Sequence, residues 1–227
     1  MTPRLRGKYS LDDPVAFGAA VPCPVTQPEH VILSAAKGTN ADLFAEVAAL
    51  WIAPGDAVAD VTAGRRVFWQ KVPAEISSKV AYSDISWENP VDCRALPYGD
   101  LSLDVVVLDP PYQPRQGGTW DGGVRGYYNL TLDSMQDVLD LYDAAIREAA
   151  RVLAPGGRLI VKCQDMSFNH RLHLVHLDVL RAMTKAGIDF ADLFVLVNEA
   201  RMIQPDRVTR QERARRAHSY FLVGVKA

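Results

Sequence analysis

The sequence has little cysteine, and this scarcity excludes two classes of small, cross-linked protein. Its 227 residues include only Cys23, Cys93 and Cys163, which lie far apart and form no Cys-x-x-Cys pair. A scattered, odd-numbered set fits neither a disulfide framework nor a cysteine zinc site. We therefore expect buried cysteines in a reducing compartment and no bound metal.

Long apolar runs are also missing, which excludes a helical membrane protein. No stretch approaches the roughly 18 apolar residues that a membrane-spanning helix needs. The polar, basic residues 1–10 predict neither a signal peptide nor a membrane anchor. We expect a cytoplasmic protein without a membrane partner. Its hydrophobic fraction of 48% is enough for the core of one domain of ordinary size.

Net charge is small, −2 at pH 7, so the chain is not coated in positive charge. Residues 200–216 nevertheless contain six arginines and only two acidic residues. A local basic segment of this kind suits an edge that faces nucleic-acid phosphates. A solvated segment of mixed charge explains the same residues equally well.

The apolar spacing divides the chain into an arm and a domain. Five prolines in residues 1–30 predict an extended arm over residues 1–36, and residues 37–227 then form a single domain. Helical spacing begins at Asn40, with Thr39 or Asn40 as the cap. The patterns predict further helices over about 133–153 and 170–185, and strands over 57–61, 80–83, 91–93, 103–108, 158–162, 190–197 and 219–225.

Strands that alternate with helices predict an α/β fold with a mostly parallel sheet. No helix-length apolar segment separates the last two strands, so we expect them to pair antiparallel as a C-terminal hairpin. In open α/β sheets, ligands bind at the carboxyl ends of the strands. Candidate functional residues should therefore follow the strands directly.

The most specific motif is Asp109-Pro110-Pro111-Tyr112, which follows the strand over 103–108. The two prolines stiffen the backbone and remove two N–H donors. A carboxylate beside a rigid carbonyl can accept both hydrogens of a planar NH2 group, and Tyr112 offers a flat face on which a base can stack. The alternative is that this segment is an ordinary Asp-Pro turn without a role in catalysis.

The complete tetrapeptide resembles the signature of amino-methyltransferases that act on nucleic acids, and Asp-Pro-Pro-Tyr looks like their adenine-N6 version. The resemblance covers roughly residues 37–225. It implies a class I methyltransferase (Rossmann-like) sheet, S-adenosylmethionine as cofactor, and duplex DNA with a flipped target base as partner. It also implies that Asp109 and Pro110 hold the amine and that Tyr112 stacks on the base, while RNA remains a possible substrate.

The family's cofactor loop resembles the segment from Asp60 to Gly64 (Asp-Val-Thr-Ala-Gly), where glycine allows a close backbone approach. Arg66 stands where the family has a second glycine. This arginine either narrows the cofactor pocket or points outward from a reshaped turn. An ordinary strand-to-helix turn is the alternative for the whole segment.

The resemblance implies further cofactor contacts. Asp84 would accept the ribose hydroxyls and Asp92 the adenine amine, although Asp84 could instead cap a helix. The segment from Lys37 to Asn40 looks like the motif that closes over the cofactor's carboxylate, with a plain helix cap as the alternative. The predicted cofactor-binding residues are Lys37, Thr39, Asp60, Thr62, Ala63, Gly64, Asp84, Ile85, Asp92, Cys93 and Asp109.

Substrate contacts are expected from the basic residues and from a glycine-rich segment. Residues 113–128 hold five glycines directly after the catalytic motif and predict a mobile lid over the flipped base, with a neutral insertion as the alternative. With residues 198–218, this lid would give short or relaxed sequence specificity. The predicted nucleic-acid-binding residues are Lys162, Arg201, Arg207, Arg210, Arg213 and Arg216.

Three histidines, His170, His173 and His176, recur at a spacing of three on a predicted helix. We interpret them as surface residues of that helix rather than metal ligands.

The sequence leaves alternative functions to consider, most of them with the same fold. RNA-base and protein-glutamine methyltransferases share it, and a nucleic-acid-binding module that has lost cofactor binding through Arg66 is a non-enzymatic alternative. A nicotinamide-linked oxidoreductase is disfavoured because Gly-x-Gly-x-x-Gly does not follow the first strand.

Overall fold

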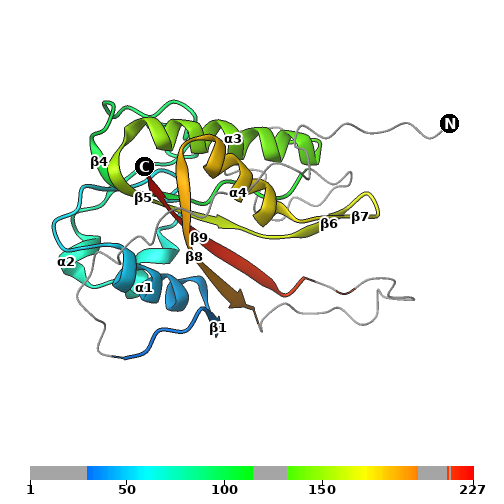
Figure 1. Cartoon of the computed structure of the whole chain (residues 1–227), viewed down its shortest axis with the longest axis horizontal. Helices are drawn as coiled ribbons and strands as arrows, with labels where there is room; N and C mark the ends of the chain where they lie inside the picture. The colour runs from blue at the N-terminus through cyan, green and yellow to red at the C-terminus, as the bar shows by residue number, and fades with distance from the viewer. Residues whose placement is uncertain (1–29, 115–131, 199–213, 215) are drawn as a thin grey trace.

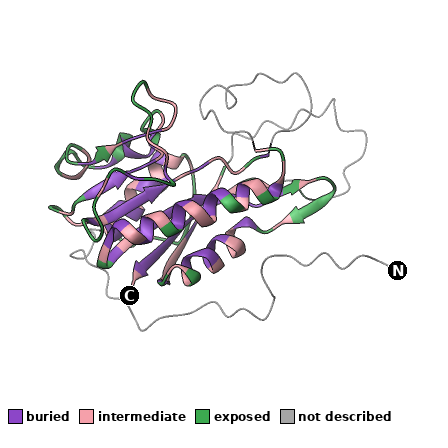
Figure 2. Ribbon diagram, turned by 90° about the horizontal axis from the view of Figure 1, so that it is seen from above, coloured by how far each residue is buried: buried purple, intermediate pink, exposed green. Residues whose placement is uncertain are grey.

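The computed structural model describes residues 30–114, 132–198, 214 and 216–227. A seven-stranded sheet lies between two layers of helices (Figures 1 and 2). Its strands are β1 (Ala35–Lys37), β2 (Val58–Asp60), β3 (Ala81–Tyr82), β4 (Leu103–Leu108), β5 (Leu153–Cys163), β8 (Ile188–Val197) and β9 (His218–Lys226). The helices are α1 (Asn40–Trp51), the 3-10 helix η1 (Val67–Lys71), α2 (Ala74–Ser77), α3 (Met135–Val152) and α4 (Val175–Lys185).

The strand order is β1-β8-β9-β5-β4-β2-β3, and every neighbouring pair is parallel except those that include β9. Strand β9 runs antiparallel between β5 and β8, and it forms a hairpin with β8. The predicted α/β fold is therefore confirmed. It is a mostly parallel, Rossmann-like sheet with an antiparallel C-terminal hairpin, as the resemblance to class I methyltransferases implies.

Two apolar cores fix the helices on the two faces of the sheet. Helices α3 and α4 pack on one face, where alternate strand residues such as Leu108 and Val161 point. Helix α1 and η1 pack on the other face, against residues such as Val107 and Ile160. Because β4 is buried on both faces, its sequence is almost continuously apolar.

Side-chain caps define where the two long helices begin. The Thr39 hydroxyl accepts a hydrogen bond from the Asp42 amide, and the Asp42 carboxylate accepts one from the Thr39 amide in return. Ser134 and Asp137 form the same reciprocal box at the start of α3. Each box satisfies N–H groups that a helix leaves free at its first turn. Of the two predicted caps of α1, the structure uses Thr39.

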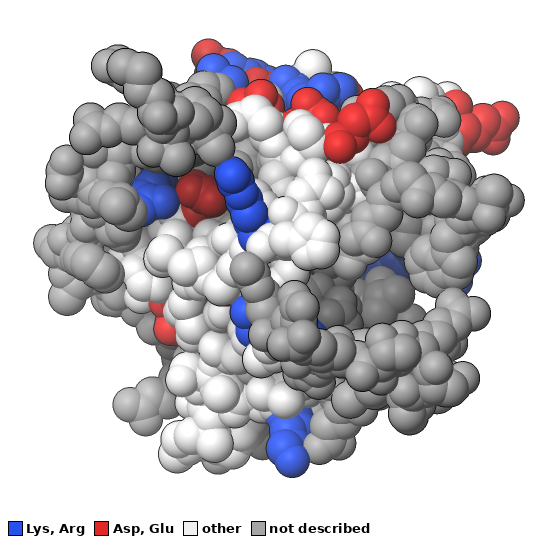
Figure 3. Space-filling model, turned by 90° about the vertical axis from the view of Figure 1, so that its right-hand side faces the viewer, with Lys and Arg blue, Asp and Glu red and all other residues white. Residues whose placement is uncertain are grey.

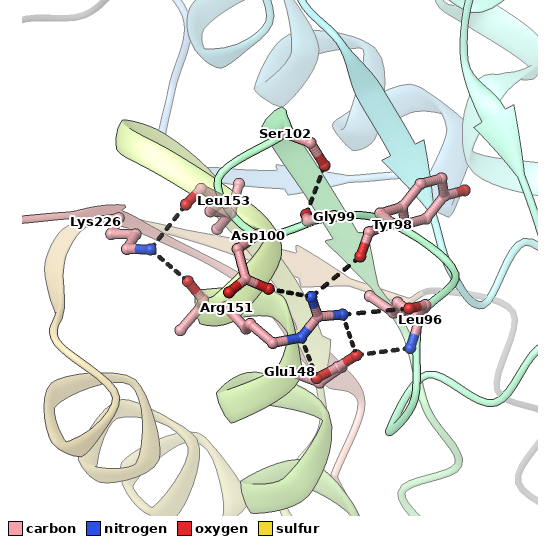
Figure 4. A network of polar contacts seen from close by, with 10 residues as sticks. Leu96, Tyr98, Gly99, Asp100, Ser102, Glu148, Arg151, Leu153 and Lys226 are labelled. Atoms are coloured by element: carbon pink, nitrogen blue, oxygen red, sulfur yellow. Dashed lines mark hydrogen bonds and ion pairs between the residues drawn. The ribbon is translucent and has the colours of Figure 1, made fainter.

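A polar network fastens the last turn of α3 to the loop that leads into β4 (Figure 4). The Arg151 guanidinium donates to the carboxylates of Glu148 and Asp100 and to the carbonyls of Tyr98 and Leu96. Glu148 in turn accepts a hydrogen bond of 2.7 Å from the Leu96 amide. The network therefore sets where β4 enters the sheet.

The predicted helix over 170–185 begins later, at Val175. The preceding residues form a two-stranded hairpin, β6 (Met166–Phe168) and β7 (Arg171–His173). Asn169 and His170 both have positive φ, as a two-residue hairpin turn requires. The predicted single helical stripe of histidines is therefore wrong, because of the three only His176 lies on α4.

Two other details differ from the prediction. No strand forms over 91–93, where the described chain makes turns instead. Strand β1 pairs in parallel with β8, so residues 35 and 36, predicted in the arm, are part of the sheet. Within the part of the chain that the structure describes, no helix has the length and apolarity to cross a membrane.

Candidate active site at the carboxyl edge of the sheet

Four predicted site residues end or follow neighbouring strands. Asp60 is the last residue of β2, Asp109 follows β4 directly, and Lys162 is the penultimate residue of β5. Asp84 comes two residues after β3. Because parallel strands end at the same edge of a sheet, these side chains lie at one edge.

Asp109 carries a carboxylate oxygen without a hydrogen-bond partner. Its amide donates to the Thr62 hydroxyl at 2.6 Å, which ties the end of β4 to the loop after β2. Its Oδ1 atom is buried and has no partner among the described residues. Burial raises the pKa of Asp109 to about 6, while the positive charge of Lys162 opposes that rise.

The rest of the tetrapeptide packs toward α3. The Tyr142 hydroxyl donates to the Lys162 carbonyl at 2.9 Å and, more weakly, to the Pro110 carbonyl at 3.5 Å. A carbonyl oxygen has two lone pairs, so Pro110 can still accept a second hydrogen bond. Tyr112 is partly exposed and packs against the core beneath α3.

A pocket opens beside the tetrapeptide on the α3 side of the sheet. Several predicted cofactor-binding residues line it, together with the two prolines of the motif. The lining residues are Val61, Thr62, Asp84, Ile85, Val91, Asp92, Cys93, Pro110, Pro111 and Leu141. Residues predicted from three separate loops thus meet around one space, although Asp109, Tyr112 and Gly64 do not line it.

Asp60 is buried beneath this edge and already has donors. It accepts hydrogen bonds from the Trp69 indole at 2.7 Å and from the Thr62 amide at 3.1 Å. Burial raises the pKa of Asp60 to about 7, and the neighbouring charges of Asp109 and Asp84 add to that rise while the two hydrogen bonds oppose it. Asp60 therefore organises the loop and has little surface for a ligand.

Asp84 is buried and joins two loops. It accepts hydrogen bonds from the Gly64 amide at 2.8 Å and from the amide and hydroxyl of Ser86 at 2.8 and 2.6 Å. Each carboxylate oxygen can accept more than one donor, so these bonds do not exhaust Asp84. They do place its carboxylate beside Gly64, whose φ of +48° is favourable for glycine.

Arg66 points away from the pocket. Its guanidinium lies 4.4 Å from the Tyr82 ring centroid and 5.2 Å from that of Trp87, and its side chain is exposed. Its backbone has a φ of 55°, the left-handed conformation that glycine adopts most easily. Of the two alternatives for this arginine, the structure shows the outward one, on a turn that keeps a glycine-like backbone.

The remaining predicted cofactor residues differ in their surroundings. The Asp92 carboxylate is paired with Arg94 through bonds of 2.6 to 3.1 Å, which lowers the pKa of Asp92. Burial raises the pKa of the Cys93 thiol to about 12. Lys37 is exposed at the end of β1, and the Thr39 hydroxyl is used in the cap of α1. Ala63 is buried, and its amide donates to the Ser83 carbonyl.

Lys162 does not face phosphates. It is only 3% exposed, its ammonium donates to Asn40 Oδ1 at 2.6 Å, and it lies 4.9 Å from the Phe221 ring centroid. The interpretation of Lys162 as a nucleic-acid contact is therefore corrected: the end of β5 is covered by η1, β9 and the start of α1.

Most of the other predicted nucleic-acid contacts fall in segments that the structure does not describe. Arg201, Arg207, Arg210 and Arg213, and most of the predicted lid over 113–128, lie outside the described residues. Arg216 is partly buried near Tyr220. On the side where β5 leads into the β6–β7 hairpin, the described surface is mostly uncharged, with charged side chains in small separate groups (Figure 3).

The end of β5 has a second polar cluster, around Asp165, whose partners the sequence did not predict. Asp165 is 3% exposed and accepts hydrogen bonds from His176 Nδ1 at 2.7 Å and from the Tyr220 hydroxyl at 3.1 Å. His218 Nε2 lies 2.9 Å from the same hydroxyl. These residues come from three distant segments, and no spacing in the sequence signals their meeting.

Comparison with known proteins gives a likeness of fold. No protein-family model matches the chain, and no curated protein does. Among solved structures, it is similar to TTHA0409 from Thermus thermophilus, described as a proposed DNA modification methylase, with 24% identity and a TM-score of 0.41 over 60% of this chain and 52% of that one.

Two further structures show how broad this likeness is. PvuII DNA methyltransferase (cytosine-N4-specific) is 17% identical, with a TM-score of 0.45 over 60% of this chain and 48% of that one. The [4+2]-cyclase SpnF is 19% identical, with a TM-score of 0.46 over 82% and 79%. The chain spans about half the length of the TTHA0409 structures. Likeness at this level does not determine the activity of this chain.

Proposed function

We propose that this chain is an S-adenosylmethionine-dependent methyltransferase that acts on the exocyclic amine of a nucleic-acid base, with adenine N6 in DNA as its substrate. The observation that carries the proposal is the buried Oδ1 atom of Asp109, which has no partner among the described residues. Leaving such an acceptor unsatisfied costs about 1–3 kcal/mol. An amino group held at this position would supply the missing donor.

The pocket beside Pro110 has a lining whose residue types suit part of the proposed cofactor. Val61, Val91 and Leu141 give it apolar walls that suit an adenine ring, and Asp84 and Asp92 are the acidic residues of its lining that would accept hydrogen bonds from the cofactor's hydroxyl and amino groups. When bound, S-adenosylmethionine supplies an electrophilic methyl group. The outward position of Arg66 leaves this pocket free of the arginine that replaces the family's glycine.

The chain's own residues would act by position and charge. Asp109 and the second lone pair of the Pro110 carbonyl would accept the two amine hydrogens, and the Asp109 carboxylate would stabilise positive charge as it develops on the nitrogen. The prolines hold both acceptors in place, so little motion is lost on binding. Tyr112 would stack on a base that has left the duplex.

The test is mass spectrometry of nucleosides from cells that express the wild type, Asp109→Ala or Asp140→Ala. The last variant is the matched control, because it removes an exposed carboxylate from α3. We expect N6-methyladenine in DNA with the wild type and the control, and a loss of about 10²–10³-fold with Asp109→Ala. Calorimetry should show that Asp109→Ala still binds S-adenosylmethionine.

Other outcomes revise or overturn the proposal. N4-methylcytosine in DNA, or a methylated base confined to RNA, would keep the enzyme class and change the substrate. No methylated nucleoside, together with no heat of binding for S-adenosylmethionine, would overturn it.

A further inference from the structure

The end of β5 buries a lysine ammonium that has no carboxylate in contact with it. Lys162 is 3% exposed, and within the described ranges no acidic oxygen lies within the 4.0 Å of an ion pair. Its hydrogen-bond partner is the neutral side chain of Asn40. A buried charge is costly unless other charges or polar groups compensate it, so a retained Lys162 needs such a group nearby.

The aromatic residues around Lys162 account for part of that compensation. The Lys162 Nζ atom lies 4.9 Å from the Phe221 ring centroid and 5.4 Å from that of Phe68. Ring faces attract a cation and favour its charged form. The two rings and Asn40 therefore hold the ammonium in one place on the α1 side of the sheet.

The sheet register brings this ammonium toward Asp109. Leu108 of β4 is paired with Val161 of β5, so Asp109 and Lys162 are the next residues along two adjacent parallel strands. Asp109 has an orphan acceptor, and Lys162 has a positive charge without an anion in contact. The register thus places a cation that has no anion in contact beside a carboxylate that lacks a donor.

We propose that Lys162 is a positioning residue whose buried ammonium, held by Asn40, keeps the Asp109 carboxylate ionised and ready to accept hydrogen bonds from the target amine. This inference rests on the role given to Asp109 in the proposed function. Because Lys162 is buried, it would act through Asp109 and would not touch the substrate.

The other groups that face Asp109 do not supply this charge. Asp60 on β2 is acidic and cannot supply a positive charge, and the charge of Asp109 helps to raise the pKa of Asp60 to about 7. Tyr142 on α3 and Cys163 on β5 are buried, and burial raises the pKa of each well above its usual range, so both are neutral near pH 7. Lys162 is the cation that acts on the pKa of Asp109 within the described chain.

The first test measures Asp109 directly and needs no enzyme activity. Carboxyl ¹³C NMR of aspartate-labelled protein, with Asp109 assigned through Asp109→Asn, would give its titration midpoint in wild type, Lys162→Met and Lys162→Arg. We expect the midpoint to rise by about one pH unit in Lys162→Met. It should stay near the wild-type value in Lys162→Arg, which keeps the charge. An unchanged midpoint in folded Lys162→Met would overturn the proposal.

Two more variants keep the test decisive if Lys162→Met does not fold. Lys162→Gln is also neutral and should raise the midpoint similarly. Asn40→Ala keeps the ammonium but releases it, so the midpoint should rise by a smaller amount. A midpoint that stays at the wild-type value in both variants would contradict the inference.

The second test uses the pH profile of methyl transfer. The acidic limb should move to higher pH in Lys162→Met, with about a fivefold loss at pH 6 that shrinks toward pH 8. A merely structural role would lower the whole profile without moving its limb. If no methyl acceptor is found, the proposed function fails, yet the NMR midpoints still decide the role of Lys162.

Discussion

Strands β4 and β5 carry polar networks at both ends, and the two networks differ in how completely they are satisfied. At the amino ends, Arg151 uses all of its N–H groups on Glu148, Asp100 and two carbonyls (Figure 4). At the carboxyl ends, Asp109 keeps a buried acceptor without a donor, and Lys162 has no carboxylate in contact within the described chain. The complete network fits a role in stability and the incomplete one a role in binding, because unsatisfied buried groups persist where a ligand completes them.

The largest expected effect on stability comes from the complete network. Arg151→Met should lower the free energy of unfolding more than its control does, because Glu148 and the backbone carbonyls lose their donors together. Urea denaturation measures this loss. The matched control is Arg147→Met on the same helix, whose exposed i,i+4 pair with Asp143 should contribute about 0–0.5 kcal/mol. Equal losses in the two variants would remove the contrast between the networks.

Above neutral pH, removing the Asp109 charge from the incomplete network should raise the free energy of unfolding, whereas removing Arg151 from the complete network lowers it. The pKa of Asp109 is about 6 in the folded protein, above its ordinary value of 3.8. The folded state therefore binds the proton more tightly, and this stabilisation, complete below about pH 4, is lost as pH rises through 6. Asp109→Asn removes that titration, so its stability relative to wild type should rise by about 1–2 kcal/mol between pH 4 and pH 8.

Thermal or urea unfolding of both proteins at the two pH values provides the measurement. Asp60 also titrates in this range, and the loss of the Asp109 charge lowers the pKa of Asp60 in the variant, so the measured change with pH includes both carboxyl groups. A stability difference that does not change with pH would mean that Asp109 is solvated in the folded state.

The smallest expected effect concerns Arg66, at the rim of the loop after β2. Arg66→Gly would relieve a left-handed backbone, worth about 1 kcal/mol, and would lose the contact with Tyr82, worth about 0.5–1 kcal/mol. We therefore expect unfolding free energies within about 1 kcal/mol of wild type. Calorimetry should show affinity for S-adenosylmethionine within about threefold, which is below 1 kcal/mol. A much larger gain in affinity would show that Arg66 obstructs the pocket.

Sequence patterns predicted the parts of the fold that local apolarity determines. The short apolar run Leu103–Leu108 predicts a doubly buried strand, and the residues that follow it were expected at the carboxyl edge, where the structure has them. The hairpin of β6 and β7 was missed because its turn is Asn169-His170, without the glycine that usually marks such turns.

The surroundings of the candidate site were less predictable than its positions. Lys162 lies near the end of an apolar strand and was expected to contact nucleic acid. Its burial depends on Asn40, Phe68 and Phe221, which come from three distant segments. These contacts around Lys162 form only in the tertiary structure, and a single sequence contains no local signal for them.

Strand β9 has a consequence for how this chain acquires its fold. Among the described strands it comes last in the chain, yet it lies between β5 and β8 and is hydrogen-bonded to both. Until those residues leave the ribosome, two strands that will be interior present open edges, and open edges invite pairing with other chains. A Cβ atom in place of the Gly224 hydrogen would lie under 3 Å from Met183 and Ile188, so β9 must fit closely against these side chains when it inserts between β5 and β8. Nascent chains stalled before β9 should therefore need more protection from chaperones than the finished protein.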